Sequence, residues 1–382
     1  MRFSKAFKLK KTQAQLDFVD VDTDFDLNLF IDPYAIEMRG DDYSIELQEY
    51  LTTYFQALLD LLRSGSATAA SNLTAHLGEP EDTFIGVSKG GAGKGVGPLQ
   101  AQQIVAALRR SRSFKTGTLN DLGETELFIP GISSDKLSDL TTNIIRLPLE
   151  SYTAAQCKLL DVPLKRIARP AAWNMSTLRW EAHYADIPVV NGKPVLLIPK
   201  ALVRRKLTLN SREFYNHYML NFLKEEEVRK GGSLVRVLKN GSRVVSKKDL
   251  KRKHPFDKTA LEQFARDHPD VLSSYKKLKG ASGVLSPKDL EGEDFSEAAF
   301  CSALRNGLAK IPTGGNDAAA YHSFMIGALS FLFFPELISP AKEDPLHDGR
   351  KRIDITYTNA STSGFFFRMR TWPKTGANRV FF

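Results

Sequence analysis

Apolar positions recur along this chain with two periods, one typical of helices and one typical of strands. Residues 44–63 carry apolar side chains at helical spacing, and Ser44 at their start suits an N-cap. This spacing predicts a helix whose buried face is formed by Ile45, Leu47, Leu51, Tyr54, Phe55, Leu58 and Leu62. Comparable patterns predict further helices over 98–111, 211–228, 257–277, 296–309 and 317–333.

Strands are predicted where apolar residues alternate with polar ones or run together between turn residues. Asn240-Gly241 predicts a hairpin turn between residues 234–238 and 242–245. Ile353, Ile355 and Tyr357 alternate with Asp354 and Thr356, which predicts a half-buried strand. Further strands are expected at 28–33, 127–129, 194–200, 363–370 and from 379 onwards.

Helices and strands in this mixture predict an α+β protein, with a mixed N-terminal region and a partial α/β/α domain at the C-terminal end. We expect an N-terminal α+β domain over residues 1–160 and a second α+β domain with a basic hairpin over 161–280. A Gly- and acid-rich linker precedes the third domain, over 295–382.

Composition limits the classes of protein to which this chain can belong. With 42% hydrophobic and 25% charged residues, the chain has the balance of a globular protein. Two cysteines, Cys157 and Cys301, argue against a disulfide framework and fit a reducing, cytoplasmic environment. The most apolar stretch, 324–334, is too short to span a membrane. The net charge of +9 suits a polyanionic partner.

Positive charge is concentrated around the predicted hairpin. Between Arg229 and Lys253 there are ten Lys or Arg residues and one acidic residue, Asp249. We therefore expect contacts with DNA phosphates here, the alternative being an ordinary solvated face. The candidate nucleic-acid-binding residues are Arg243, Lys247, Lys248, Lys251, Arg252 and Lys253, together with Arg350 and Arg352 before the C-terminal strand.

A glycine-rich loop at residues 89–97 resembles the deviant Walker A motif of ParA-type ATPases. The resemblance implies nucleotide binding, with backbone amides and lysine charges on the phosphates. The cofactor-binding residues would be Lys89, Gly91, Gly93 and Lys94. Gly95 lacks the hydroxyl that would bind Mg²⁺, and Pro98 places the start of the next helix beyond the loop. The alternative is a mobile Gly- and Lys-rich loop before a helix, which can still contact nucleic-acid phosphates through its amides and Lys89 and Lys94.

Two polar segments are further candidates. Asp139, Asn143 and Arg146 follow one another at helical spacing, either as a catalytic face or as a surface or interface element. Six aspartates between 17 and 32 fall among apolar residues without the glycine and glutamate of a calcium loop. They are expected on turns and at a helix N-terminus.

The C-terminal stretch, a helix followed by a connection with carboxylates and then Gly-Arg-Lys-Arg-Ile-Asp-Ile, resembles the front half of a PD-(D/E)xK restriction-endonuclease-like nuclease domain. The resemblance implies that Asp354 is the first ligand of Mg²⁺, with Glu336 or Glu343 as a further ligand. The D/E-x-K of the second strand is not in this sequence, so we expect a C-terminally truncated, inactive form. The alternative is that Asp354 pairs with Arg350 or Arg352.

The wider chain resembles an uncharacterised prokaryotic family that shares the FIDP strand, the SKGGAGKG loop and the SDLTTNIIR helix. Such proteins end in a nuclease-like domain that is common in phage-defence and restriction loci. The resemblance implies a DNA-directed protein of the restriction-like nuclease class, with a second copy or a defence-system protein as a further partner. The alternatives are a non-enzymatic nucleic-acid-binding or partner-sensing protein, and a nucleotide-binding protein.

Overall fold

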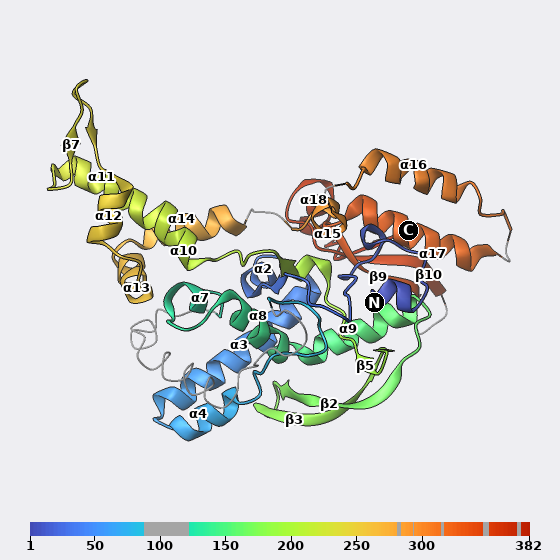
Figure 1. Ribbon diagram of the computed structural model, residues 1–382. Helices are drawn as coiled ribbons and strands as arrows, with labels where there is room; N and C mark the ends of the chain where they lie inside the picture. The colour runs from blue at the N-terminus through green and yellow to red at the C-terminus, as the bar shows by residue number, and fades with distance from the viewer. Residues whose placement is uncertain (88–121, 281–283, 293, 315–316, 347–350, 373–375) are drawn as a thin grey trace.

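The computed structural model describes residues 1–87, 122–280, 284–292, 294–314, 317–346, 351–372 and 376–382, with the backbone alone at 343–346 and 351–352. Within these ranges the chain combines helices with small antiparallel sheets, which confirms the predicted α+β class. Figure 1 shows a main body (residues 1–210), an arm (residues 211–280) that projects from it, and a C-terminal unit (residues 284–382).

The main body is built from helices and very short strands, with one long hairpin along its lower edge in Figure 1. Its helices are α1 (Phe3–Ala6), η1 (Gln13–Gln15), α2 (Pro33–Glu37), α3 (Asp42–Arg63), α4 (Ala67–Thr74), α7 (Glu124–Phe128), α8 (Ser134–Ile144), α9 (Arg146–Leu159) and η2 (Lys200–Leu202). Its strands are β1 (Phe30–Ile31), β2 (Lys165–Asn174), β3 (Arg179–Ile187), β4 (Val189–Val190), β5 (Lys193–Pro194) and β6 (Val203–Arg204). The sheets pair β1 with β6, β2 with β3 and β4 with β5.

Helix α3 buries most of the face that its spacing predicts, including Leu47, Leu51 and Tyr54. Its N-cap is Asp41 and not Ser44, because the Asp41 carboxylate accepts hydrogen bonds from the Ser44 amide and hydroxyl at 3.1 and 2.8 Å. Ile45 is 49% exposed and lies outside the core face, which corrects its predicted place.

One hydrophobic core holds the main body together. It includes residues from both sides of position 160, such as Cys157, Val162 and Trp173. Trp173 is fully buried and meets Tyr54 edge to face at 5.1 Å between ring centroids. The predicted boundary at 160–161 therefore lies within this core. The run 195–198 is also fully buried, as its apolar composition predicts. It does not form the strand expected at 194–200, because only Pro194 of that range lies in a strand, β5.

The arm is a second helical unit with its own core. Its elements are α10 (Ser211–Glu213), the π-helical η3 (Phe214–Met219), α11 (Leu220–Lys230), β7 (Arg236–Val237), β8 (Arg243–Val244), α12 (Lys247–Lys253), α13 (Lys258–Asp267) and α14 (Pro269–Gly280). The first three form one helix capped by Asn210, whose side chain accepts a hydrogen bond from the Glu213 amide at 3.0 Å. The predicted helix 257–277 is divided before Pro269, whose ring disfavours a continuous helix.

Helix α7 replaces the strand predicted at 127–129, so that expectation is wrong. Leu127 and Phe128 belong to the arm's core, and the buried Glu126 accepts hydrogen bonds from the Ser211 amide and hydroxyl at 2.6 and 3.0 Å. Glu124 pairs with Lys276 at 2.8 Å. These long-range contacts give the buried carboxylates of α7 their partners and join the main body to the arm.

The C-terminal unit packs helices on a three-stranded sheet. It contains α15 (Pro287–Glu291), α16 (Glu297–Leu308), α17 (Ala318–Phe333), β9 (Leu337–Leu346), β10 (Lys351–Asn359), α18 (Gly364–Thr371) and β11 (Arg379–Phe381). The order is β11-β10-β9, antiparallel throughout. The strand predicted at 363–370 is helix α18 instead. As a helix it directs Phe366 onto Phe333, at 5.4 Å between ring centroids, and leaves Phe365 63% exposed.

Candidate nucleic-acid interface

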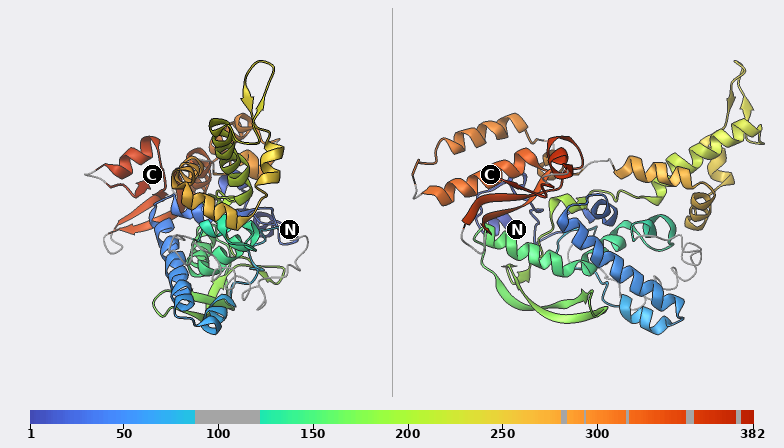
Figure 2. Two further views of the ribbon diagram at one scale, coloured as in Figure 1. Left: turned by 90° about the vertical axis from the view of Figure 1, so that its left-hand side faces the viewer. Right: turned by 180° about the vertical axis from the view of Figure 1, so that it is seen from behind.

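The arm presents its basic hairpin well away from the main body, as both views of Figure 2 show. Phe214, Leu220, Leu250, Leu261 and Tyr275 are buried in its core and fix the positions of the surrounding helices. The basic surface is therefore carried by a packed unit rather than by an isolated loop.

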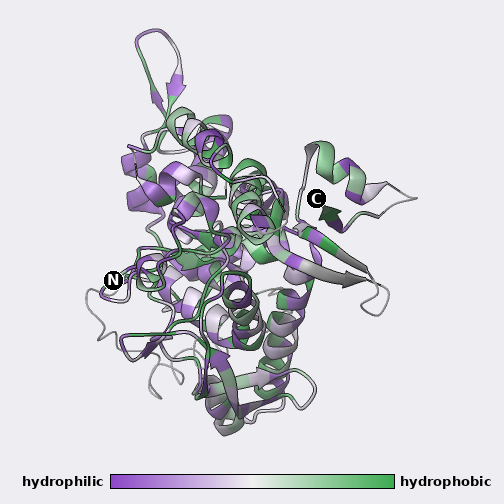
Figure 3. Ribbon diagram, turned by 90° about the vertical axis from the view of Figure 1, so that its right-hand side faces the viewer, coloured by the Kyte–Doolittle hydropathy of each residue, from purple (hydrophilic) through white to green (hydrophobic). Residues whose placement is uncertain are grey.

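The hairpin is a short two-stranded ribbon, β7 and β8, which confirms the turn predicted at Asn240-Gly241. Gly241 has a φ of +79°, which glycine adopts without strain. The Asn240 side chain accepts a hydrogen bond from the Ser242 amide at 3.1 Å. Val237 and Leu238 are 68% and 47% exposed at the tip. In Figure 3 the loop of the ribbon is mostly in the hydrophilic colour.

Helix α12 follows the ribbon and exposes one charged face. Ser246 caps it by accepting from the Lys248 amide at 3.2 Å, and the fully buried Leu250 anchors its other face. The predicted nucleic-acid-binding residues Lys247, Lys248, Lys251, Arg252 and Lys253 are all exposed, as is Arg243 on β8. The structure thus brings these residues together on the ribbon and the helix beside it.

Only part of this positive charge is neutralised. Asp249 lies 2.9 Å from Arg236 and 2.8 Å from Arg252, so one carboxylate serves two guanidinium groups. Lys253 pairs with Glu227, and this contact holds the pKa of Glu227 below its usual value. Within the described residues, the remaining exposed cations of the ribbon and α12 make no ion pair: Lys239, Arg243, Lys247, Lys248 and Lys251.

The candidate catalytic residues lie in the C-terminal unit, far along the chain from the arm. The carboxylate of Asp354, on the central strand β10, is 68% exposed, and its Oδ2 lies 3.8 Å from Nε2 of His322 on α17. Glu343 occupies the position on β9 between Lys342 and Asp344, the partners of Ile355 and Ile353. Its backbone therefore lies across from Asp354.

Glu336 lies at the other end of β9, where its carbonyl accepts from the Ala360 amide at 2.8 Å. Glu343 lies seven positions further along the extended chain, which is roughly 23 Å. Glu336 and Asp354 are therefore not brought together. Within the described ranges, no three His, Cys, Asp or Glu residues converge on a metal-sized site.

Some predicted positions lie outside the described residues. These are Lys89, Gly91, Gly93 and Lys94 of the glycine-rich loop, the helix predicted at 98–111, and Arg350. Arg352 lies on β10, for which the backbone alone is described.

A buried polar network includes Asn143, on α8, and Arg146, the first residue of α9. Arg146 is 1% exposed and donates to Asp82 at 2.8 Å and to Asn143 at 3.1 Å. Arg169 pairs with the same Asp82 and with Glu150, which lies 2.6 Å from Nε2 of His183. The network ties α8 and α9 to the β2–β3 hairpin, so Asn143 and Arg146 occupy an interior position.

Sequence reasoning singled out Arg146 and Asn143 but missed their partners. Asp82, Glu150, Arg169 and His183 are spread over about a hundred residues, and none belongs to a short motif. The one available signal was polar residues in otherwise apolar surroundings. Burial opposes the ionisation of Asp82, but the charges of Arg146 and Arg169 outweigh it and hold the pKa of Asp82 below its usual value.

Asp139 has a different environment from its neighbours on α8. Burial, together with the nearby charges of Asp135, Glu79 and Asp26, raises its pKa to about 8. Gly86 approaches the same cluster, since a Cβ there would lie 3.3 Å from an Asp135 carboxylate oxygen. This acidic cluster lies beside residue 87, where the described part of the loop ends.

Comparison with known families identifies the main body. The family described as a domain of unknown function, DUF8370, matches residues 8–210, and the chain belongs to this family. The matched range coincides closely with the residues that share the main core. No match was found among curated proteins or among solved structures.

Across the parts of the chain that the structure describes, no helix has the length and apolar character that crossing a bilayer requires.

Proposed function

We propose that this protein binds DNA, and that the ribbon β7–β8 and helix α12 make the contact. The observation that carries the proposal is the group of exposed cations without ion-pair partners on the arm, which includes Lys239, Arg243, Lys248 and Lys251. Phosphate contacts of this kind release condensed counterions and supply most sequence-independent affinity.

The shape of the arm favours a duplex. A two-stranded β-ribbon fits the major groove of B-DNA, and a basic helix next to it can lie on the flanking phosphates. Val237 and Leu238 at the tip are exposed beside basic residues, where they can contact thymine methyl groups.

Electrophoretic mobility shift at several salt concentrations tests the proposal. Changing Lys239, Arg243, Lys248 and Lys251 to Gln should weaken duplex binding and reduce the slope of log K against log salt by up to roughly 3–4 units. The matched control changes four exposed cations of the main body: Lys5, Lys158, Lys165 and Arg179. Equal losses in the two variants would show that net charge alone is responsible and would contradict the proposal.

A second proposal assigns the C-terminal unit to the restriction-like nuclease class, with the associated role in phage defence. It is supported by the packing of α17 on β9 and β10, by the exposed Asp354 on the central strand, and by the direct pairing of β10 with β11. The described donors do not by themselves fit Mg²⁺, because Asp354 offers one carboxylate and His322 lies 3.8 Å from it.

Titration with Mn²⁺ in the presence of a DNA duplex tests this second proposal. If Asp354 is a ligand, Asp354→Asn should abolish a saturable binding event that the unchanged protein shows. Glu336→Gln is the matched control, because Glu336 lies at the opposite end of β9. Binding that survives Asp354→Asn, or is absent from the unchanged protein, argues against the nuclease class.

A further inference from the structure

A polar cavity of about 360 Å³ lies where the main body, the end of α14 and the C-terminal unit meet. Figure 1 shows these three parts around α2 and α18. The main body contributes Arg39, Arg204 and Thr208, the arm contributes Lys279, and the C-terminal unit contributes Glu336 and the hydroxyl-bearing residues 361–363. A volume of this size accommodates a small ligand.

Two nearly buried guanidinium groups line the cavity. Arg39 is 7% exposed and Arg204 is 9% exposed. Nε of Arg39 donates to Asp41 and to Ser44, both at 3.0 Å, while its buried Nη2 has no hydrogen-bond partner among the described residues. Nη1 of Arg204 donates to the carbonyls of residues 201 and 203, while its buried Nε is likewise without a partner in the described part of the chain.

The two arginines also oppose each other electrostatically. Burial lowers the pKa of Arg204, the nearby Asp32 raises it, and the charge of Arg39 lowers it. Buried N–H groups without acceptors cost free energy, and buried like charges add to that cost. Both side chains line the cavity, so an anion held there would be attracted by both guanidinium charges.

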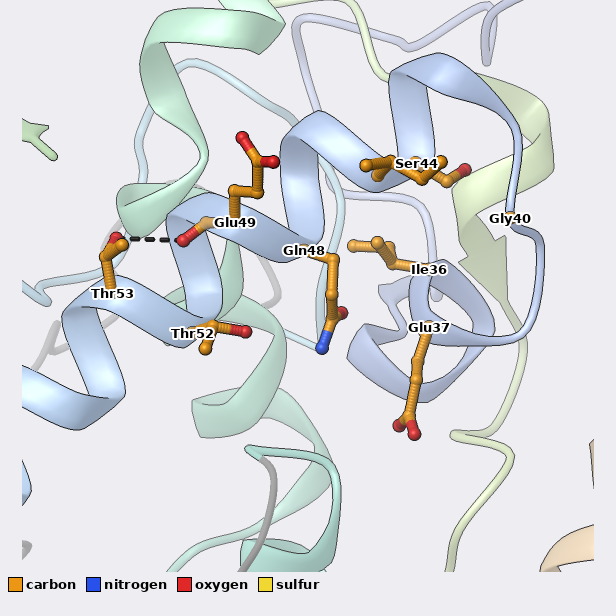
Figure 4. A pocket seen from close by; sticks show the side chains of 9 residues that line it. Ile36, Glu37, Gly40, Ser44, Gln48, Glu49, Thr52 and Thr53 are labelled. Carbon is orange, nitrogen blue, oxygen red and sulfur yellow. Dashed lines mark hydrogen bonds between the residues drawn. The ribbon is translucent and has the colours of Figure 1, made fainter.

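A second hollow, along α3, differs from this cavity in the charge of its lining residues (Figure 4). It measures about 290 Å³ and is lined by Ile36, Gln48 and Thr52 together with the acidic Glu37 and Glu49. No Lys or Arg is present among its lining residues. An anion is therefore favoured in the cavity beside Arg39 and Arg204 and disfavoured in this one.

We propose that the cavity between Arg39 and Arg204 binds the phosphoryl group of a small phosphate ester or of a nucleic-acid 5′ end. Guanidinium groups match phosphate oxygens in geometry and charge, and Thr362 is an exposed residue among those that line the cavity. Glu336, exposed at the rim, can accept hydrogen bonds from ligand hydroxyl or amino groups. This inference is independent of the DNA contacts proposed for the ribbon and α12.

Thermal unfolding of the full chain tests the proposal at constant ionic strength. Inorganic phosphate and a nucleoside 5′-monophosphate should each raise Tm relative to chloride, since a ligand that binds the folded state stabilises it. Thr362→Glu places a negative charge at the opening and should abolish the shift. Ser302→Glu, on the exposed face of α16, adds the same charge elsewhere and should preserve it. Arg204→Met should weaken phosphate binding by roughly tenfold or more.

A second comparison of Tm shifts distinguishes the two sources of the phosphoryl group. If a mononucleotide raises Tm more than a 5′-phosphorylated oligonucleotide does, the ligand is a free phosphate ester. If the phosphorylated oligonucleotide raises Tm more, and a 5′-hydroxyl oligonucleotide does not, the ligand is a nucleic-acid 5′ end. Equal shifts in the Thr362→Glu and Ser302→Glu proteins, or no shift in the unchanged protein, would overturn the proposal. Neither result affects the mobility-shift test of the arm.

Discussion

The interior of the main body contains ionised groups that compensate one another. Asp82 accepts from both Arg146 and Arg169, and Glu150 links Arg169 to His183. Carboxylates and guanidinium groups balance in charge, so the network can be buried without an excess of either sign. The sequence pattern singled out Arg146 at this scale, but it did not indicate which residues are its partners.

Removal of one guanidinium group should expose the cost of burying the carboxylate. Arg146→Met is expected to reduce the free energy of unfolding by about 3–5 kcal/mol, because Asp82 loses a partner while it stays buried. Urea denaturation measures the change. Arg166→Met is the matched control, since Arg166 pairs with Asp186 at 3.5 Å on the exposed surface, where a loss below about 1 kcal/mol is expected. Similar losses in both variants would contradict a specific role for the network.

Asp139 should make stability depend on pH. Its pKa in the folded protein is raised to about 8, so the folded state keeps a proton that the unfolded chain releases above pH ~3.9. Stability therefore falls as pH rises between these two values. Asp139→Asn cannot ionise, and the variant should match the unchanged protein near pH 4 and exceed its stability at pH 9.

The exposed Asp161 supplies the control for this measurement. Asp161→Asn removes a carboxylate at an exposed position, so the effect of Asp139 is read as the difference between the two variants. A profile for Asp139→Asn that runs parallel to that of the unchanged protein would show that Asp139 does not titrate in this range.

Individual elements were predicted well where the apolar face is long. Helices α3, α16 and α17 begin and end within a few residues of the predicted positions, because a helix of several turns averages out single exceptions such as Ile45. Short apolar runs were ambiguous. Leu127-Phe128-Ile129 and the phenylalanines before Arg368 fit a strand by composition, yet both segments are helical because of the surfaces on which they pack.

The ribbon allows a prediction about one element. Val237→Ser with Leu238→Ser should weaken binding to a duplex more than binding to a single strand, because the apolar tip is proposed to enter the groove. Tm should remain unchanged, since both side chains are largely exposed. Fluorescence anisotropy with matched duplex and single-stranded probes measures the ratio. An unchanged ratio would contradict entry of the tip into the groove and leave the phosphate contacts of the ribbon and α12 as the whole interaction.

At the scale of the whole molecule, the two hydrophobic cores predict that the main body and the arm differ in stability and can be destabilised independently. The main body and the arm bury different sets of residues, joined chiefly by α7 and Tyr34. Leu250→Ala should cost about 2–5 kcal/mol in the arm and accelerate amide exchange over 211–280. Leu47→Ala should act on the main body in the same way. Hydrogen exchange followed by mass spectrometry distinguishes the two, and a uniform acceleration in both variants would indicate a single cooperative unit.

The sequence by itself determined the α+β class, the long helices, the hairpin turn and the basic segment. These follow from local rules: apolar periodicity, the turn preference of Asn-Gly, and charge density along the chain. Charges on adjacent residues of a short helix stay together however the rest of the chain folds. The basic surface of α12 could therefore be predicted without tertiary information.

Only the tertiary structure decided which distant residues meet. Glu126 reaches Ser211, Asp82 reaches Arg169, and Arg39 reaches the cavity that Arg204 also lines. No spacing in the sequence encodes these contacts, because each depends on how whole elements pack. For the same reason, the two guanidinium groups became a candidate phosphate site only once α2, β6 and the C-terminal unit had been placed around one cavity.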